Sequence, residues 1–243
     1  MQVRHLILSP HLDDAVLSLG GLLATEGSTC AVMTCFSGAP DPVQRTPWDA
    51  LTGFRDSAEA MRARIKENRT ALSILLVPES QIINLPLLDW QYRDPFASRT
   101  DIIETIVAEV LAYTGSLEGP VSVYAPGLRK HPDHELVGEA LRELQRRDTS
   151  ENEFFFYADL PYAVGLDEDA LVKTIFGGDT YVERERIALT EDALHKKIEA
   201  IRAYESQMAG LGGEEKLLKD IEEYAKAGNA YRETVYRIKR TTT

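Results

Sequence analysis

Short apolar runs along the chain alternate with longer segments in which apolar side chains recur every three or four residues. The run at residues 3–8 (VRHLIL) is typical of a buried strand, and apolar residues then recur at helical spacing through residues 15–23. A second apolar run, TCAVMTCF, occupies residues 29–36. A strand, a helix and a strand joined by short connections form a βαβ unit, whose strands are parallel and whose crossover is right-handed. The pattern therefore predicts an α/β fold built on an open, mostly parallel sheet.

Later segments repeat this alternation. Helical periodicity predicts helices at residues 55–76, 100–113, 190–208 and 214–227, and strand-like runs occur at residues 75–77, 82–85, 121–125, 154–157 and 231–239. Proline and polar residues predict long loops at residues 37–53 and 86–98, and residues 164–187 read as irregular, with one strand pair around residues 180–182. No internal repeat or composition shift divides the chain, so we expect a single domain over residues 1–243.

Charge and apolar content narrow the class of protein. A formal net charge of −12 argues against non-specific binding to nucleic acid or to an anionic membrane surface. The chain opens without a signal-peptide pattern and has no apolar segment of about 18 residues, so we expect a cytoplasmic protein without a membrane span. The oligomeric state stays open, a homo-oligomer included.

The two cysteines, Cys30 and Cys35, both lie in the second apolar run. Five residues of extended chain span roughly 16 Å, which is too far for a disulfide. We therefore expect two reduced cysteines in the core, which suits a reducing compartment.

Polar side chains gather where the first predicted strand turns into a helix. His11, Asp13 and Asp14 fall within four residues of an otherwise apolar segment. In an open α/β sheet this position is the carboxyl edge, where ligands bind, and imidazole nitrogen and carboxylate oxygen are both good Zn²⁺ ligands. The alternative is purely structural: either aspartate can cap the helix that follows, and His11 can be an ordinary loop histidine.

A second cluster repeats this layout. The sequence HPDHE at residues 131–135 follows the strand-like run at residues 121–125 and a short loop, and a helical pattern continues after it. Two such strand–loop–helix units can bring histidines and aspartates to one ion at the same sheet edge. Structural zinc sites are usually closed and rich in thiolates, whereas a His/Asp/His set leaves a coordination position for water. The spacing does not decide which of His131 and His134 is the ligand.

These two clusters resemble the motifs of a known family, the zinc-dependent de-N-acetylases of the LmbE-like, or PIG-L, type. The residues that carry the resemblance are PHLDD at residues 10–14 and HPDH at residues 131–134. The resemblance implies the LmbE-like deacetylase fold, a Rossmann-like three-layer α/β sandwich. It also implies a Zn²⁺ cofactor bound by His11, Asp14 and His134, and an acetylated amino sugar as the small-molecule substrate.

The family likeness implies catalytic roles for three further residues. Asp13 would be the general base on the zinc-bound water, His131 would stabilise the oxyanion or protonate the leaving amine, and Asp133 would orient His131. These residue types suit amide hydrolysis, which needs an activated nucleophile, charge relief on the carbonyl oxygen and a proton for the amine.

Weaker matches extend the resemblance over nearly the whole chain. They give two candidate substrate-binding residues, Arg64 on a predicted helix and Asp159 just after a predicted strand. The structural alternatives are a surface ion pair of Arg64 with Glu67 and a turn or ligand-orienting carboxylate at Asp159. The chain departs from many family members at Leu12, where they have Pro, and at Ala15, where they have Glu. Without that Glu, the contacts to the substrate or the hydrogen bonds beside the site are expected to differ from those of other members.

Two aspects of the function remain open between alternatives. The reaction class follows from the chemistry together with the family likeness, but the sugar follows from the likeness alone. A zinc amidase that acts on a non-sugar N-acyl substrate or a natural-product intermediate is one alternative, and a non-catalytic sugar-binding member is another. A nucleotide-dependent transferase is disfavoured, because no G-x-G-x-x-G follows the first strand. Aromatic residues in the loop at residues 86–98, among them Trp90, either stack on a sugar ring or cover a core edge.

Overall fold

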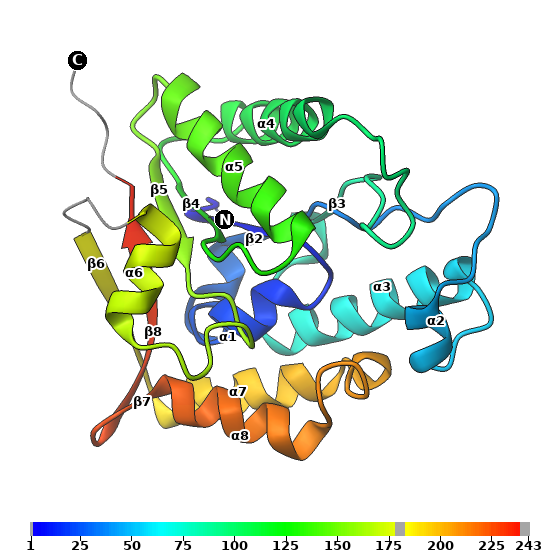
Figure 1. The fold of residues 1–243 in the computed structure, drawn as a ribbon. Helices are drawn as coiled ribbons and strands as arrows, with labels where there is room; N and C mark the ends of the chain where they lie inside the picture. The colour runs from blue at the N-terminus through cyan, green and yellow to red at the C-terminus, as the bar shows by residue number, and fades with distance from the viewer. Residues whose placement is uncertain (1, 178–182, 239–243) are drawn as a thin grey trace.

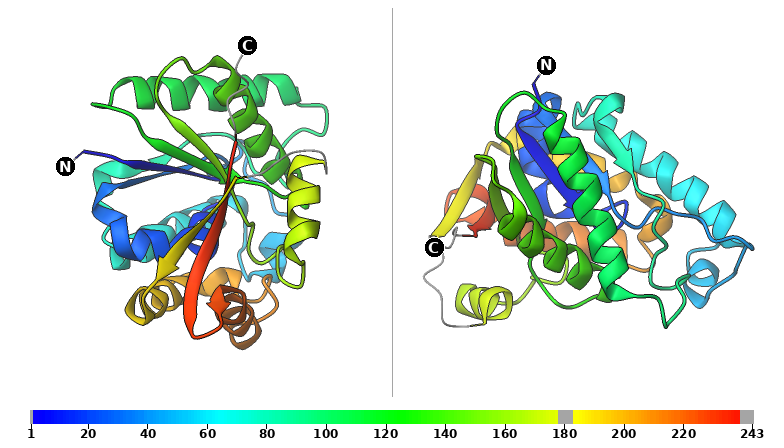
Figure 2. Two further views of the ribbon diagram at one scale, coloured as in Figure 1. Left: turned by 90° about the vertical axis from the view of Figure 1, so that its left-hand side faces the viewer. Right: turned by 90° about the horizontal axis from the view of Figure 1, so that it is seen from above.

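The protein has a central sheet between two layers of helices (Figures 1 and 2). The structure is a computed structural model that describes residues 2–177 and 183–238. Its sheet has the strand order β3-β2-β1-β4-β5-β8-β6, with β7 paired to β8. The strands are β1 (His5–Ser9), β2 (Cys30–Thr34), β3 (Ile82–Asn84), β4 (Ser122–Pro126), β5 (Glu153–Tyr157), β6 (Glu183–Leu189), β7 (Lys226–Ala227) and β8 (Ala230–Arg237). The first five are parallel to one another, and β8 pairs antiparallel with β5.

The two helical layers are formed by different parts of the chain. The helices are α1 (Asp14–Glu26), α2 (Pro47–Leu51), α3 (Ser57–Ile74), α4 (Arg99–Gly115), α5 (Pro132–Arg147), α6 (Glu168–Phe176), α7 (Glu191–Arg202) and α8 (Glu214–Ala225), with short 3₁₀ turns η1 (Gly27–Thr29), η2 (Glu79–Gln81) and η3 (Glu205–Gln207). Helices α4 and α5 cover one face of the sheet, and α1, α3, α7 and α8 cover the other (Figure 1). This is the predicted three-layer α/β architecture with a mostly parallel sheet.

The predicted βαβ unit at the start of the chain is confirmed. Strands β1 and β2 pair in parallel, with Ile7 opposite Val32, and α1 connects them. Both strands lie in the sheet interior and are buried on both faces, which explains why they read as continuous apolar runs. The expectation for the cysteines is confirmed as well, because Cys30 and Cys35 are free and buried.

Two local predictions are wrong. Residues 75–77 form no strand, because Leu76 takes a left-handed conformation (φ 61°) that turns the chain after α3. The segment 164–187 is not irregular: it contains α6, which Asp167 caps by accepting from the N–H of Ala170, and the first part of β6. The edge strand β6 escaped detection because four of its seven residues are charged and four are exposed. The strand pair predicted around residues 180–182 lies outside the described residues.

A buried ion pair joins the helical layer to the antiparallel edge of the sheet. Lys197 of α7 lies 2.7 Å from Glu233 of β8, and both side chains are nearly inaccessible to solvent. The Glu233 carboxylate also accepts from the N–H groups of Gly21 and Leu22, where α1 is interrupted at Leu19. Glu233 thus satisfies the donors that this break in α1 leaves free. No helix among the described residues has the length and apolar character needed to cross a membrane.

Replacing Lys197 by Met should lower the free energy of unfolding by about 3 kcal/mol, because Glu233 would stay buried without its cation. Urea denaturation followed by circular dichroism measures this. The matched control is Lys196→Met, which removes a partly exposed pair with Asp192 on the same helix and should cost less than about 0.5 kcal/mol. Equal small changes in both variants would contradict the assigned role of the buried pair.

Candidate active site

Three neighbouring parallel strands deliver the polar residues of the two motifs to one sheet edge. The chain leaves β1 into residues 10–13, leaves β4 into the loop before α5, and leaves β5 towards Asp159. The carboxyl ends of parallel strands meet at the same edge. As a result the rings of His11 and His134, far apart in sequence, lie with their centroids 5.2 Å apart.

Three side-chain atoms form a nearly equilateral triangle at this edge. Nδ1 of His11 lies 3.2 Å from Oδ2 of Asp14, Nε2 of His134 lies 3.3 Å from the same oxygen, and the two nitrogens are 3.4 Å apart. Ligand atoms about 2.0–2.1 Å from a tetrahedral ion lie about 3.3–3.4 Å from one another. The spacing therefore fits three ligands of one divalent cation, with a fourth position free.

Each histidine of the triangle has its other ring nitrogen on a buried carboxylate. Nε2 of His11 lies 3.0 Å from Oδ2 of Asp133, and Nδ1 of His134 lies 3.3 Å from Oδ1 of Asp159. A carboxylate behind a ligating histidine fixes the tautomer, aims the free nitrogen at the ion and raises its basicity. The donor set and its support thus suit a metal ion.

The electrostatics of the site also favour a cation. Burial lowers the pKa of His134, but the carboxylates of Asp14 and Asp159 outweigh burial and raise this pKa to about 10. Burial acts in the same way on His11, yet its contacts with Asp133 and Asp14 raise its pKa well above the usual range. The cluster therefore carries an excess of negative charge that binds protons when no other cation is present. A divalent cation would replace those protons.

Asp13 lies beside the triangle with a carboxylate that caps no helix. It occupies the N-cap position of α1, but its side chain makes no capping hydrogen bond. The capping alternative for Asp13 is therefore wrong. Burial, and next the Asp14 carboxylate, raise the pKa of Asp13 to about 6. A carboxylate of this basicity at a cavity wall suits a general base at neutral pH.

His131 is held by the backbone of its own helix. It is the N-cap of α5, and its Nδ1 accepts from the backbone N–H of Asp133 at 3.2 Å. Burial, and next the positive charges on His11 and His134, lower the pKa of His131 to about 4. The Asp133 carboxylate was predicted to orient His131, and this prediction is wrong. The carboxylate contacts His11, and the main-chain N–H of Asp133 orients His131 instead.

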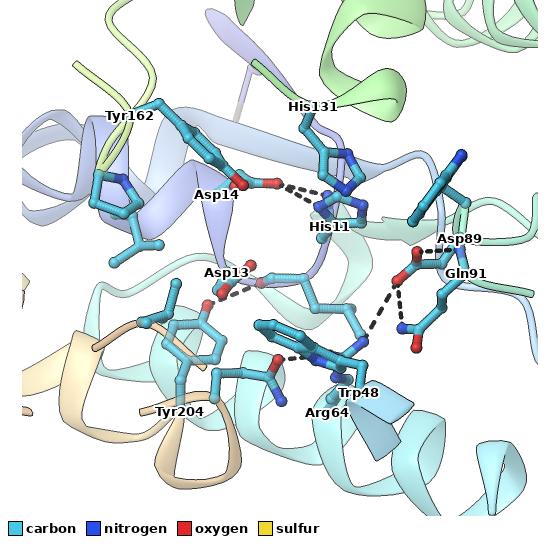
Figure 3. Close-up of a pocket in the computed structure, with 16 residues that line it drawn as sticks. His11, Asp13, Asp14, Trp48, Arg64, Asp89, Gln91, His131, Tyr162 and Tyr204 are labelled. Carbon is cyan, nitrogen blue, oxygen red and sulfur yellow. Dashed lines mark hydrogen bonds and ion pairs between the residues drawn. The ribbon is translucent and has the colours of Figure 1, made fainter. Parts of the chain in front are cut away.

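A cavity opens over the triangle, and Figure 3 shows its walls. His11, Asp13, Asp14 and His131 face it from the sheet edge, and Arg64 faces it from α3. Arg64 donates to Oε1 of Gln207 at 2.6 Å and lies 3.6 Å from Asp89. The alternative pair with Glu67 is wrong, because Glu67 accepts from the N–H and hydroxyl of Ser206.

Asp159 does not fit its predicted substrate-binding role. The side chain is 1% exposed and does not line the cavity. One carboxylate oxygen faces His134, and the other accepts from the N–H of Leu128 at 3.3 Å. Asp159 thus lies on the side of His134 that faces away from the cavity. This position agrees with the alternative in which Asp159 orients a metal ligand.

Two residues of the site escaped the sequence analysis. Asp89 lines the cavity, and Arg93 lies 2.6 Å from the Asp133 carboxylate, which also accepts from the N–H of Trp90. All three belong to the loop at residues 86–98 that was predicted from its prolines and polar residues. Charged and aromatic side chains in a loop near the carboxyl edge of the sheet were the signal that could have identified them.

Asp159→Asn should weaken metal binding about 10–100-fold, because the amide cannot support the ligating form of His134 as a carboxylate does. Competition with a chromogenic chelator measures the affinity without any assay of turnover. Asp169→Asn on the exposed face of α6 is the matched control and should leave the affinity unchanged. An Asp159 variant with the affinity of the wild type would contradict this assignment.

Fold and site together define an α/β protein with a histidine–carboxylate centre, suited to a metal ion, at the floor of a cavity. The chain matches the model of the PIG-L family, described as GlcNAc-PI de-N-acetylase, over residues 6–145. This match covers more than half of the chain, so the protein belongs to the PIG-L family. Membership places it among the hydrolytic de-N-acetylases.

Relatives with described activities support this placement. The chain is 23% identical over 244 residues to 2'-N-acetylparomamine deacetylase of Niallia circulans, covering 86% of this chain and 82% of the relative. Its fold is similar to that of A40926 pseudoaglycone deacetylase, with a TM-score of 0.81, 26% identity and full coverage of both chains (100% each). It also resembles the zinc-inhibited form of teicoplanin deacetylase, with a TM-score of 0.80, 24% identity and 99% coverage of both chains. These similarities confirm the predicted LmbE-like fold.

Proposed function

We propose that the protein is a zinc-dependent hydrolase that removes an N-acetyl group from an amino-sugar or glycoside derivative. The observation that carries the proposal is the triangle of His11, Asp14 and His134, with the uncapped carboxylate of Asp13 beside it at the cavity wall. The relatives named as deacetylases of 2'-N-acetylparomamine and of A40926 pseudoaglycone support an acetylated sugar as the substrate class.

His11, Asp14 and His134 would hold the ion, and Asp133 and Asp159 would hold the two histidines. When bound, zinc lowers the pKa of a coordinated water to about 7 and polarises the carbonyl of the amide. The remaining chemistry belongs to side chains of the cavity.

Asp13 takes the proton of the attacking water as general base. Its pKa of about 6 lets the carboxylate be ionised at neutral pH and still basic enough to accept this proton. After the water oxygen has bonded to the carbonyl carbon, protonated Asp13 gives the proton to the amide nitrogen. The C–N bond then breaks, and acetate and the free amine leave.

His131 stabilises the oxyanion as a neutral donor. Because its Nδ1 accepts a backbone N–H, the hydrogen-bond network assigns the proton of the neutral ring to Nε2. Burial lowers the pKa of His131, and a cation held by His11 and His134 would act in the same direction, so the neutral ring supplies a hydrogen bond to the developing oxyanion rather than a proton to the amine. Of the two roles that the sequence left open for His131, this favours the first.

Arg64 is the candidate for sugar recognition. It projects from α3 into the cavity, and its Nε is buried without a partner among the described residues. A sugar hydroxyl within reach would satisfy this donor. Asp89 holds the other end of the guanidinium near the cavity wall.

The deciding experiment measures acetate released from a panel of N-acetylated amino sugars by protein stripped with a chelator and then reloaded with metal. We expect about one ion per chain and acetate release that returns with the ion. Zinc should be titrated rather than added in excess, since one of the similar structures is a zinc-inhibited form. Cleavage of N-acyl amino acids but of no acetylated sugar would shift the substrate to a non-sugar amide. Binding of acetylated sugars without turnover would favour the sugar-binding alternative.

A further inference from the structure

A second cavity adjoins the one over the triangle. Its walls come from the loop at residues 86–98, from α2, and from the facing ends of α4 and α5. Three residues, Trp48, Trp90 and Gln91, line both cavities. The two hollows are therefore neighbours across a wall made mainly of two indole rings, of which Trp48 is labelled in Figure 3.

The two cavities differ in chemistry. The first has His11 and Asp14 of the triangle among its lining residues, together with Asp13 and His131. The second is lined mostly by apolar side chains: Trp48, Trp90, Pro95, Ala97, Ile102 and Leu136. A site that holds reacting groups next to a hollow that holds none is the arrangement expected for a ligand of which only one part reacts.

The charged groups of the second cavity already have partners within the protein. Arg93 is bound to the carboxylate of Asp133, Arg99 to Glu139, and Asp94 accepts from the N–H of Phe96. What these walls offer a ligand is therefore chiefly aromatic and aliphatic surface.

The wall between the cavities is fixed to the metal centre. The backbone N–H of Trp90 donates to Oδ2 of Asp133 at 2.8 Å, and the same oxygen receives Nε2 of His11. The Trp90 side chain itself is 57% exposed, which leaves a large aromatic face free for a ligand. Aromatic faces of this kind gain most from burial against another flat apolar group.

From this geometry we propose that the second cavity is a subsite for an apolar, aromatic aglycone carried by the substrate, whose N-acetylated sugar occupies the cavity over the triangle. The proposal rests on the proposed function and names its substrate class: aryl glycosides of N-acetylated amino sugars. It predicts that the aglycone contributes binding energy through contacts with Trp48, Trp90 and Ile102 rather than through hydrogen bonds.

The test compares the phenyl and methyl β-glycosides of N-acetylglucosamine, together with an N-acetylated aminocyclitol glycoside, on the metal-loaded enzyme. A phenyl group that enters an apolar subsite should raise kcat/KM at least about tenfold over the methyl group. Ala97→Phe, which fills the second cavity, should remove this ratio. Ala108→Phe, at an exposed position on α4, is the matched control and should keep the ratio.

A second measurement does not depend on turnover. Both tryptophans of the chain line both cavities, so intrinsic fluorescence reports ligand binding, and the comparison of a phenyl with a methyl glucoside isolates the contribution of the second cavity. Phenyl β-glucoside, which has no amide to cleave, should change the fluorescence at concentrations at least about tenfold lower than methyl β-glucoside. Equal responses to both glucosides in the wild type would overturn the subsite, even if Ala97→Phe failed to fold.

The outcomes separate the subsite from the proposed function. Acetate release without a preference for the phenyl glycoside, or a preference that survives Ala97→Phe, rejects the subsite and keeps the function. A preference for the aminocyclitol glycoside also rejects it. Binding of phenyl β-glucoside without acetate release from any N-acetylated sugar rejects the function and keeps an apolar subsite.

Discussion

Asp13→Asn should lower kcat for acetate release by about 10²–10⁴-fold while the protein keeps its metal ion. Asparagine preserves the size of the side chain, but its amide cannot accept the proton of the attacking water. The Asp13 carboxylate makes no capping hydrogen bond to α1, so its replacement leaves the helix start intact. Steady-state kinetics on an acetylated sugar and metal analysis of the same preparation measure both quantities.

The neighbouring carboxylate provides the contrast for this experiment. Asp14→Asn changes the adjacent residue by the same chemistry, but it turns the carboxylate that faces both His11 and His134 into a neutral amide, which is a much weaker metal ligand. It should therefore lose the ion as well as turnover. Full activity of Asp13→Asn would remove Asp13 as the base, and loss of metal from that variant would move Asp13 into the ligand set.

His134→Ala should weaken metal binding by more than about 100-fold, because loss of a supporting carboxylate alone costs about 10–100-fold. Nε2 of His134 is one corner of the triangle, and the buried ring fills the space between Asp14 and Asp159. Dialysis against a metal buffer, followed by elemental analysis, measures the loss.

His131→Ala is the matched control on the same turn of α5. Its ring lies with its centroid 5.3 Å from that of His134, and its Nδ1 is occupied by a backbone N–H. This variant should keep the ion and lose about 10²–10³-fold in kcat, as expected for removal of an oxyanion donor. If His131→Ala lost the ion and His134→Ala kept it, the ligand role would pass to His131, which also lies close enough to offer a nitrogen.

The two motifs could be predicted from the sequence because each is formed by residues that are close together along the chain. A buried strand, a turn and a helix within about fifteen residues leave a periodic pattern, and the polar residues at the turn stand out against it. Dependence on a local apolar pattern also explains why two elements were not predicted. Helix α6 is short, and the edge strand β6 has charged, exposed side chains, so neither leaves a strong apolar pattern.

What the sequence by itself determined is the α/β class, the positions of the strand–turn–helix units and the residue types at their turns. Only the tertiary structure decided which strands are neighbours, and the order β1-β4-β5 brings His11, His134 and Asp159 to one place. The tertiary structure also decided which side chains interact. The Asp133 carboxylate contacts His11 rather than the nearby His131, and Arg93 contacts it from a loop that is distant in sequence. The physical reason is that periodicity records how deeply each residue is buried, whereas hydrogen bonds and ion pairs depend on distances through space that strand order sets.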